Sequence, residues 1–349
     1  MAASSFDIEA LKKALEPAPE QRALRPHLEG TLELPETLRR ALESEVWGWL
    51  QAMPPAAEQS ATYLLEAGGK RLRPLLAMLS CGAAGGEPTA ALPVATAVEL
   101  LHSGTLLHDD VVDDSERRRG QPAARLVWGN AVAVLSGDFC FFAALDALVA
   151  RQELGLVSRA LQVARSLAQG ELEQLERRGD PMRADFAAYW RGIELKTASL
   201  MAFSTWGGAW CAGAGEDGLD VLERYGVALG RAFQVVDDVL DLQGEPEQTG
   251  KTLGQDLADG TFTLPVLYAM ETSESLAARL RAAAQQSEVP ASELDALIRA
   301  VQNSDGVQKA REDAQRLTHE ASSILMQLPS SAYRGILETL TRSLLNRVS

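Results

Sequence analysis

The segments LLHDDVVDD (residues 106–114) and FQVVDDVLDL (residues 233–242) each hold the pattern DDxxD inside an apolar run. Residues four apart in an α-helix lie on the same face, so the first and last aspartates of each pattern share a face. The middle aspartate points about 100° away, because the helix has about 3.6 residues per turn. The six aspartates are Asp109, Asp110, Asp113, Asp237, Asp238 and Asp241. The two segments predict helices that carry carboxylates among buried side chains.

Paired acids on a helix usually mark a solvated face, which is the simplest alternative for both clusters. Here apolar residues flank the clusters at 106–107, 111–112, 235–236 and 239–240. Several like charges in such surroundings are costly unless cations neutralise them. A donor set of carboxylates alone selects a hard cation, and Mg²⁺ held by few carboxylates completes its shell with phosphate oxygens. We therefore expect a magnesium site that also binds a phosphate compound.

Composition indicates an all-α fold. Hydrophobic residues make up 46% of the 349 residues and aromatic residues 5%, and Ala and Leu dominate, which favours packed helices over sheet. From Leu34 onward, helical stretches alternate with short Gly/Pro breaks, as in an antiparallel bundle. Residues 91–112 and 219–242 are apolar around most of their circumference, as buried central helices are. We expect a loose polar leader at 1–30 and one helical domain at 31–349.

Net charge and apolar patterning restrict location and partners. The formal net charge of −15 argues against a general attraction to nucleic acid or anionic lipid. The first 17 residues lack the apolar stretch of a signal peptide, and no window approaches about 18 uncharged apolar residues, so no membrane span is expected. The cysteines lie far apart among apolar or small residues, as reduced packing residues do: Cys81, Cys140 and Cys211. These features predict a soluble cytoplasmic protein.

Two basic clusters stand out against the negative charge. The segment GGKRLRP (68–74) places Lys70 and Arg73 on one helix face after two glycines, and Arg117–Arg118–Arg119–Gly120 follows the first aspartate cluster. An arginine cluster beside aspartates suggests an anion bridged to metals. A lysine-rich surface turn and an intramolecular salt-bridge network remain the alternatives. His102 lies two helical turns before the first cluster, where it would reach a second phosphate group unless it is an ordinary core histidine.

Seven motifs follow one another along the chain. They are GGKRLRP (68–74), LLHDDVVD (106–113), RRG (118–120), GNAVAVLSGD (129–138), ELKTASL (194–200), GRAFQVVDDVLD (230–241) and GKTLGQDLADGTFTLP (250–265). In this order they resemble the trans-polyprenyl diphosphate synthase family, which includes farnesyl, geranylgeranyl and longer-chain diphosphate synthases. The resemblance extends from about Leu34 to the end of the chain.

The resemblance implies a helical bundle of the isoprenoid synthase type, with a deep central cavity and aspartate clusters facing each other at its mouth. It implies an Mg²⁺-dependent prenyltransferase that joins isopentenyl diphosphate to an allylic diphosphate. The allylic C–O bond breaks, the isopentenyl double bond attacks the carbocation, and loss of a proton completes each five-carbon addition. Neither an organic cofactor nor a nucleophilic side chain is needed. A homodimer is also implied.

The resemblance assigns roles residue by residue. Three Mg²⁺ ions would bind together with the substrate, ligated directly by Asp109, Asp113 and Asp237 and supported by Asp110, Asp238 and Asp241. These six aspartates and Lys196 would be the catalytic residues. Isopentenyl diphosphate would be held by Lys70, Arg73, His102 and Arg119. The allylic diphosphate or the chain beside it would be contacted by Arg118, Lys196, Thr197, Gln234 and Lys251.

Two positions depart from the commonest family pattern. Arg125 stands where Asn or His is usual, which adds charge, and Thr261 stands where Lys is usual, which removes a cation that would face a phosphate. Activity is expected, but allylic affinity is the property that the change at Thr261 puts in doubt.

Small residues before the first aspartate predict a long product. In the family, bulky aromatics four and five residues before this aspartate stop growth early, and here the positions hold Thr105 and Gly104. A product of twenty carbons or longer is therefore expected. A deeper floor, or ordinary core packing, is equally compatible with Phe139, Phe141, Phe142 and Leu145.

Two other functions fit parts of the pattern. A class I terpene cyclase shares the bundle and the first aspartate motif, but it has a different second metal motif and no second substrate for Lys70 and Arg73 to bind. A non-catalytic subunit of a synthase would tend to lose aspartates, whereas this chain keeps all six. The synthase is the preferred hypothesis.

Overall fold

The computed structural model describes residues 36–177, 185–243, 253–286 and 289–345. The expected leader at 1–30 lies outside these ranges, as does Lys251. Apart from one two-stranded ribbon, the regular elements of the described chain are helices, as the composition predicts. The α-helices are α2 (Glu36–Leu50), α3 (Pro55–Glu66), α4 (Leu72–Ala83), α5 (Leu92–Val112), α6 (Ala124–Trp128), α7 (Asn130–Val149), α8 (Leu154–Arg177), α9 (Phe186–Ile193), α10 (Ser199–Cys211), α11 (Glu216–Gln243), α13 (Gln255–Ala258), α14 (Leu264–Thr272), α15 (Glu274–Ala284), α16 (Ala291–Gln302), α17 (Gly306–Leu325) and α18 (Ala332–Ser343). Shorter elements are the 3₁₀ turn η1 (Pro88–Ala91), the π-helical turn η3 (Glu194–Ala198), and the strands β1 (Arg117–Arg118) and β2 (Gln121–Pro122).

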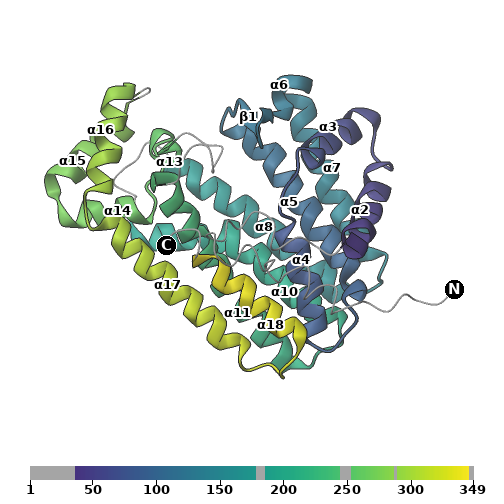
Figure 1. The fold of residues 1–349 in the computed structure, drawn as a ribbon. Coiled ribbons are helices and arrows are strands. Elements are labelled where there is room, and N and C mark those ends of the chain that lie inside the picture. The colour runs from purple at the N-terminus through teal and green to yellow at the C-terminus, as the bar shows by residue number, and fades with distance from the viewer. Residues whose placement is uncertain (1–35, 178–184, 244–252, 287–288, 346–349) are drawn as a thin grey trace, which may run out of the picture.

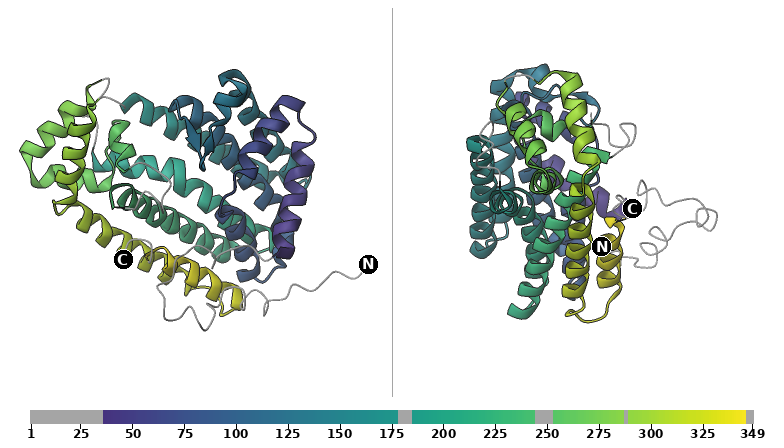
Figure 2. Two further views of the ribbon diagram at one scale, coloured as in Figure 1. Left: turned by 45° about the horizontal axis from the view of Figure 1, so that its top comes forward. Right: turned by 90° about the vertical axis from the view of Figure 1, so that its left-hand side faces the viewer.

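The helices form a bundle around α4, α5, α10 and α11 (Figure 1). Helix α10 packs between α4 and α11, and α5 packs against α4 and α7. The pair α15 and α16 lies at one end of the molecule and α2 and α3 at the other, while α17 and α18 run along one edge (Figures 1 and 2). Buried apolar side chains from α2 to α18 belong to one continuous cluster. The two aspartate motifs thus lie on central helices.

Helices α5 and α7 approach each other through a pair of glycines. A Cβ added at Gly104 of α5 would lie 2.9 Å from the carbonyl oxygen of Gly137, and a Cβ added at Gly137 would lie 3.0 Å from the carbonyl oxygen of Gly104. Real Cβ atoms essentially never come within 3.0 Å of another atom, and a Cβ at Gly137 would also lie 2.3 Å from Nε2 of His108. The contact therefore holds the two backbones together and leaves no space for a side chain at either position.

Within the described ranges, two helical stretches are long and apolar enough to cross a membrane by length and composition, although both carry acidic residues. They are Pro88–Val112, whose apolar window is 67% buried in the bundle, and α7, whose window is 44% buried. Helix α7 packs against α5, α3 and α8, so one side of it belongs to the core. Its other side and its neighbours carry large exposed apolar side chains: Leu126, Val127, Val134, Leu135, Phe142, Val149, Leu154, Leu161 and Leu172.

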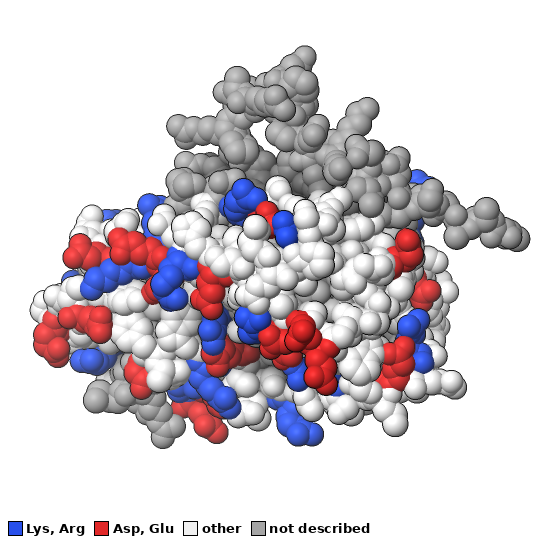
Figure 3. Space-filling model, turned by 90° about the horizontal axis from the view of Figure 1, so that it is seen from below, with Lys and Arg blue, Asp and Glu red and all other residues white. Residues whose placement is uncertain are grey.

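Charged side chains are mixed in sign on the face shown in Figure 3, where Lys and Arg lie interspersed with Asp and Glu. Such a face produces no extended positive field for nucleic acid.

Candidate active site

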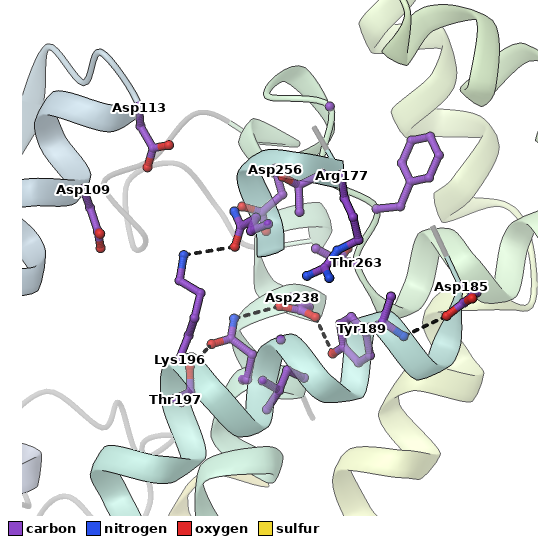
Figure 4. A pocket seen from close by; sticks show the side chains of 18 of the residues that line it. Asp109, Asp113, Arg177, Asp185, Tyr189, Lys196, Thr197, Asp238, Asp256 and Thr263 are labelled. Atoms are coloured by element: carbon purple, nitrogen blue, oxygen red, sulfur yellow. Dashed lines mark hydrogen bonds between the residues drawn. The ribbon is translucent and has the colours of Figure 1, made fainter. Parts of the chain in front are cut away.

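A pocket of about 390 Å³ lies between the end of α5, the end of α8, α9 with η3, and the C-terminal part of α11 (Figure 4). The segment from α13 to the start of α14 closes its far wall. Of the residues predicted from the sequence, it brings together Asp109, Asp113, Arg118, Lys196, Thr197, Gln234 and Asp238. Residues far apart in the chain therefore meet at one site.

The first cluster presents Asp109 to this pocket. Burial raises the pKa of the Asp109 carboxyl to about 7, while Lys196 lowers it and Glu171 and Asp113 raise it further. Asp113 is exposed and follows the last residue of α5. A cation beside Asp109 would relieve the cost of ionising its carboxyl group.

The middle aspartate of the first cluster is held away from the pocket. Asp110 is fully buried, its Oδ1 accepts a hydrogen bond from Nε of Arg118 at 2.8 Å, and Nη2 of Arg118 forms an ion pair with the same oxygen at 2.7 Å. Burial raises the pKa of Asp110, and Arg118 opposes the rise. Arg118 lies on β1, which pairs with β2 through Arg119 and Gly120. Both turn residues have positive φ, as a type I′ hairpin turn requires.

Arg125 fixes the turn that follows the first cluster. Its Nε donates to the carbonyl oxygen of Ser115 at 2.7 Å, and its Nη1 lies 2.7 Å from the carboxylate of Asp114. Asp114 has a left-handed backbone with φ of 52°. The departure from the family pattern at Arg125 therefore has a structural role here.

The second cluster contains a hydrogen-bonded network centred on Asp238, which is 2% exposed. Its Oδ2 accepts from the Tyr189 hydroxyl at 2.5 Å, and its Oδ1 accepts from Nε2 of Gln234 at 3.0 Å (Figure 4). Oε1 of Gln234 accepts in turn from the Thr197 hydroxyl at 2.8 Å. Burial raises the pKa of Asp238 to about 6, the two donors oppose the rise, and Asp237 adds to it. Burial and Asp238 together raise the pKa of Tyr189 well above its ordinary value.

Lys196 and Thr197 lie on the π-helical turn η3, between α9 and α10. Such turns are rare and occur frequently at functional sites. Nζ of Lys196 forms an ion pair with Glu171 and donates to Oε1 of Gln174 at 3.0 Å (Figure 4). An anionic ligand could therefore displace Glu171 as the partner of Lys196.

A second basic region lies behind the hairpin and the start of α4. Burial lowers the pKa of His102 well below its ordinary value, and the charges of Arg73 and Arg119 lower it further. Burial also lowers the pKa of Arg73, which Glu99 and Asp237 oppose. His102 is therefore neutral at pH 7, with one ring N–H to donate.

The two basic motifs of the sequence meet in this region. Arg119 donates to the carbonyl oxygens of Leu64, at 3.2 Å, and Gly68. A Cβ at Gly69, which has φ of 140°, would lie 2.9 Å from the Arg119 guanidinium. The glycine therefore makes room for the arginine, while Lys70 is exposed.

The remaining predicted aspartates lie on the same α11 helix. The charge of Asp237 opposes the lowering of the Arg73 pKa by burial. Oδ2 of Asp241 accepts from the backbone N–H of Asp256 at 3.4 Å.

Sequence reasoning missed several residues of the site. Glu171 lies beside the pocket, where it pairs with Lys196. The pocket itself is lined by Gln174, Arg177, Asp185, Tyr189 and Asp256. Asp256 falls within the quoted motif GKTLGQDLADGTFTLP, which was a usable signal. Tyr189 stands seven residues before Lys196 with no charge pattern to mark it.

The site fits a hard cation that brings further ligands. Its donors are carboxylates, and Asp109 is costly to ionise without a cation. Oδ2 of Asp110 is buried with no hydrogen-bond partner within the described ranges. Across those same ranges, no three His, Cys, Asp or Glu side chains converge closely enough to hold a metal by themselves. Mg²⁺ commonly completes such a shell with water and substrate phosphates.

An apolar cavity of about 660 Å³ adjoins the pocket and shares Asp109 and Lys196 with it. It lies between α5, α7 and α8. Its lining residues include Thr105, Phe141, Phe142 and Leu145, but not Phe139 or Gly104. Gly104 instead makes the close helix contact with α7. It therefore gives the cavity no extra space.

An all-α bundle with acidic clusters at the mouth of an apolar cavity defines an enzyme of the isoprenoid synthase class. The chain belongs to the polyprenyl synthetase family, whose model matches residues 54–301. It is a polyprenyl diphosphate synthase, a transferase of prenyl groups, and the predicted fold and family are confirmed.

Similar proteins span most of the chain. The heptaprenyl diphosphate synthase component 2 of Geobacillus stearothermophilus is 36% identical over 310 residues, which is 87% of this chain and 92% of the relative. The octaprenyl diphosphate synthase of Haemophilus influenzae is 36% identical over 286 residues, 82% of this chain and 87% of the relative. A Caulobacter crescentus polyprenyl synthase, crystallised with calcium and isoprenyl diphosphate, matches with a TM-score of 0.85 and 31% identity over 100% of both chains.

Proposed function

We propose that this protein condenses isopentenyl diphosphate with an allylic diphosphate, in the presence of Mg²⁺, to give an all-trans polyprenyl diphosphate of twenty carbons or longer. The observation that carries the proposal is the apolar cavity of about 660 Å³ that shares Asp109 and Lys196 with the acidic pocket. A diphosphate in the pocket would direct its hydrocarbon chain into this cavity. The names of relatives include heptaprenyl and octaprenyl diphosphate synthases, which supports a long product.

The allylic diphosphate would bind in the pocket. Lys196 would exchange Glu171 for a phosphate oxygen, and the Thr197 hydroxyl and the Gln234 amide lie beside it. The full predicted set of contacts is Arg118, Lys196, Thr197, Gln234 and Lys251.

Isopentenyl diphosphate would bind in the second basic region. Neutral His102 would donate one N–H, and the buried guanidinium of Arg73 would supply charge. The predicted contacts are Lys70, Arg73, His102 and Arg119.

Mg²⁺, as three ions with substrate bound, would be held by Asp109, Asp113 and Asp237. When bound, it supplies the positive charge that stabilises the departing diphosphate. Asp110 and Asp238 would act in support, because both are buried and hydrogen bonded within the protein. Asp241 would support the same site from the next turn of α11.

We further propose a cytoplasmic homodimer without a membrane span, built from one helical domain per subunit. The exposed apolar side chains of α6, α7 and α8 would be covered by a second copy. Light scattering of the purified protein should give twice the chain mass. A membrane protein would instead require detergent for its extraction.

Turnover by the protein alone tests the function. The purified chain, Mg²⁺, isopentenyl diphosphate and farnesyl diphosphate should give longer polyprenyl diphosphates by mass spectrometry, and D109N or D237N should abolish the reaction with helicity unchanged. D114N is the matched control, because Asp114 is exposed and pairs with Arg125. A cyclic hydrocarbon product would establish a cyclase. Absence of turnover without a second protein would establish a subunit that is not catalytic alone.

A further inference from the structure

Arg177, the last residue of α8, lies at the pocket, and Figure 4 shows its side chain directed inward. Its side chain is only 22% exposed. Nη2 of Arg177 lies 3.6 Å from the position that a Cβ on Gly192 of α9 would occupy. The guanidinium therefore rests against the glycine at the surface of the pocket.

Other cations of the pocket have close carboxylate partners. Arg118 is held by Asp110 at 2.7 Å, and Lys196 forms an ion pair with Glu171. Arg177 differs, because its ion pair within the described chain is with Glu173 at 3.6 Å. Glu173 lies equally far, at 3.6 Å, from Arg191. Arg177 therefore keeps donor groups directed at the pocket that no described carboxylate engages closely.

The wall formed by residues 260–263 lacks a cation. It lines the same pocket as Arg177 and consists of Gly260, Thr261, Phe262 and Thr263. Thr261 stands where the resembled family usually has a lysine. The pocket is acidic, since Asp109, Asp113, Asp185, Asp238 and Asp256 line it. Arg177 is therefore a further cation, beside Arg118 and Lys196, that lines the pocket and could contact a diphosphate there.

We propose that Arg177 binds the diphosphate of the allylic substrate and replaces the positive charge that is absent at Thr261. This inference rests on the proposed function and adds a substrate-binding residue to it. A guanidinium suits the role, because its fixed array of N–H groups matches two phosphate oxygens at once.

Calorimetric titration with inorganic diphosphate in the presence of Mg²⁺ tests the contact without turnover. Charge-assisted hydrogen bonds of this kind contribute enough that R177Q should weaken binding by roughly tenfold or more. R191Q is the matched control, since Arg191 shares Glu173 at the same distance but does not line the pocket. It should bind diphosphate as the wild type does.

Steady-state kinetics identify which substrate is affected. R177Q should raise the KM for farnesyl diphosphate by roughly tenfold and leave the KM for isopentenyl diphosphate unchanged. Adding T261K to R177Q should restore most of the lost allylic affinity, because it returns a cation to the lining of the same pocket.

The outcomes separate the two proposals. If the wild type turns over but R177Q behaves like R191Q, the role of Arg177 is wrong and the proposed function stands. An equal rise in both KM values would also overturn the role, because it would indicate a general disturbance of the site. If the wild type neither binds diphosphate with Mg²⁺ nor turns over, the proposed function fails and Arg177 has no such role.

Discussion

The hydroxyl of Tyr189 should be essential for holding Asp238 in place. Removing it in Y189F leaves the carboxylate, 2% exposed, with Gln234 as its remaining side-chain donor within the described chain. Hydrogen bonds to charged groups contribute about 1.5–3 kcal/mol, so we expect the free energy of unfolding to fall by about 2 kcal/mol. The measurement belongs at pH 8, where Asp238, with a pKa of about 6, is ionised.

Urea denaturation followed by circular dichroism gives this difference directly. Y225F is the matched control, because among the described residues the hydrogen-bond partners of the buried Tyr225 hydroxyl are neutral, Thr341 Oγ1 at 3.0 Å and the Leu337 carbonyl oxygen at 3.4 Å. It should cost about 1 kcal/mol and leave turnover unchanged. Y189F should also lower turnover, because Asp238 adjoins the predicted metal ligand Asp237.

A double-mutant comparison isolates the charge. In a D238N background the phenol faces a neutral amide, so adding Y189F should cost about 1 kcal/mol instead of about 2. The reasoning is refuted if Y189F costs no more than Y225F, or if its cost is the same with aspartate and with asparagine at position 238.

Three further predictions concern space and burial. A Cβ at Gly170 would lie 2.7 Å from Cγ of Lys196, so G170A should displace the lysine and lower turnover by roughly tenfold. G48A is the control, because a Cβ at Gly48 would have nothing within 4 Å, and it should leave turnover unchanged. F141A should lengthen the products seen by mass spectrometry, because Phe141 lines the apolar cavity, and F139A should not. Burial raises the thiol pKa to about 12 for Cys81 and Cys140 and to about 11 for Cys211. The three thiols are therefore protonated at pH 8 and should react with Ellman's reagent only after unfolding. Rapid labelling of the native protein would contradict this assignment.

The aspartate clusters were predictable because their information is local. Apolar neighbours and four-residue spacing determine which helix face carries each carboxylate, and α5 and α11 are central helices as expected. The middle aspartates, Asp110 and Asp238, are both buried. The motif order was sufficient to identify the family.

The partners of those carboxylates were not predictable, because they depend on packing between distant segments. Tyr189 is 49 residues from Asp238 in sequence, and no periodic pattern connects them. Arg177 could be read only as a charged residue near a helix end until the fold placed it beside Gly192. Gly104 was misread for the same reason. A small side chain suggests open space, but here a second backbone fills it.

The contact between Gly104 and Gly137 has a practical consequence for engineering product length. Randomising position 104 in a mutant library would recover destabilised proteins, since each new side chain would push α5 and α7 apart. Useful diversity lies one residue further along, at Thr105, and across the cavity at Phe141, Phe142 and Leu145. A library restricted to these four positions would vary the size of the apolar cavity. The close contact between Gly104 and Gly137 would stay intact.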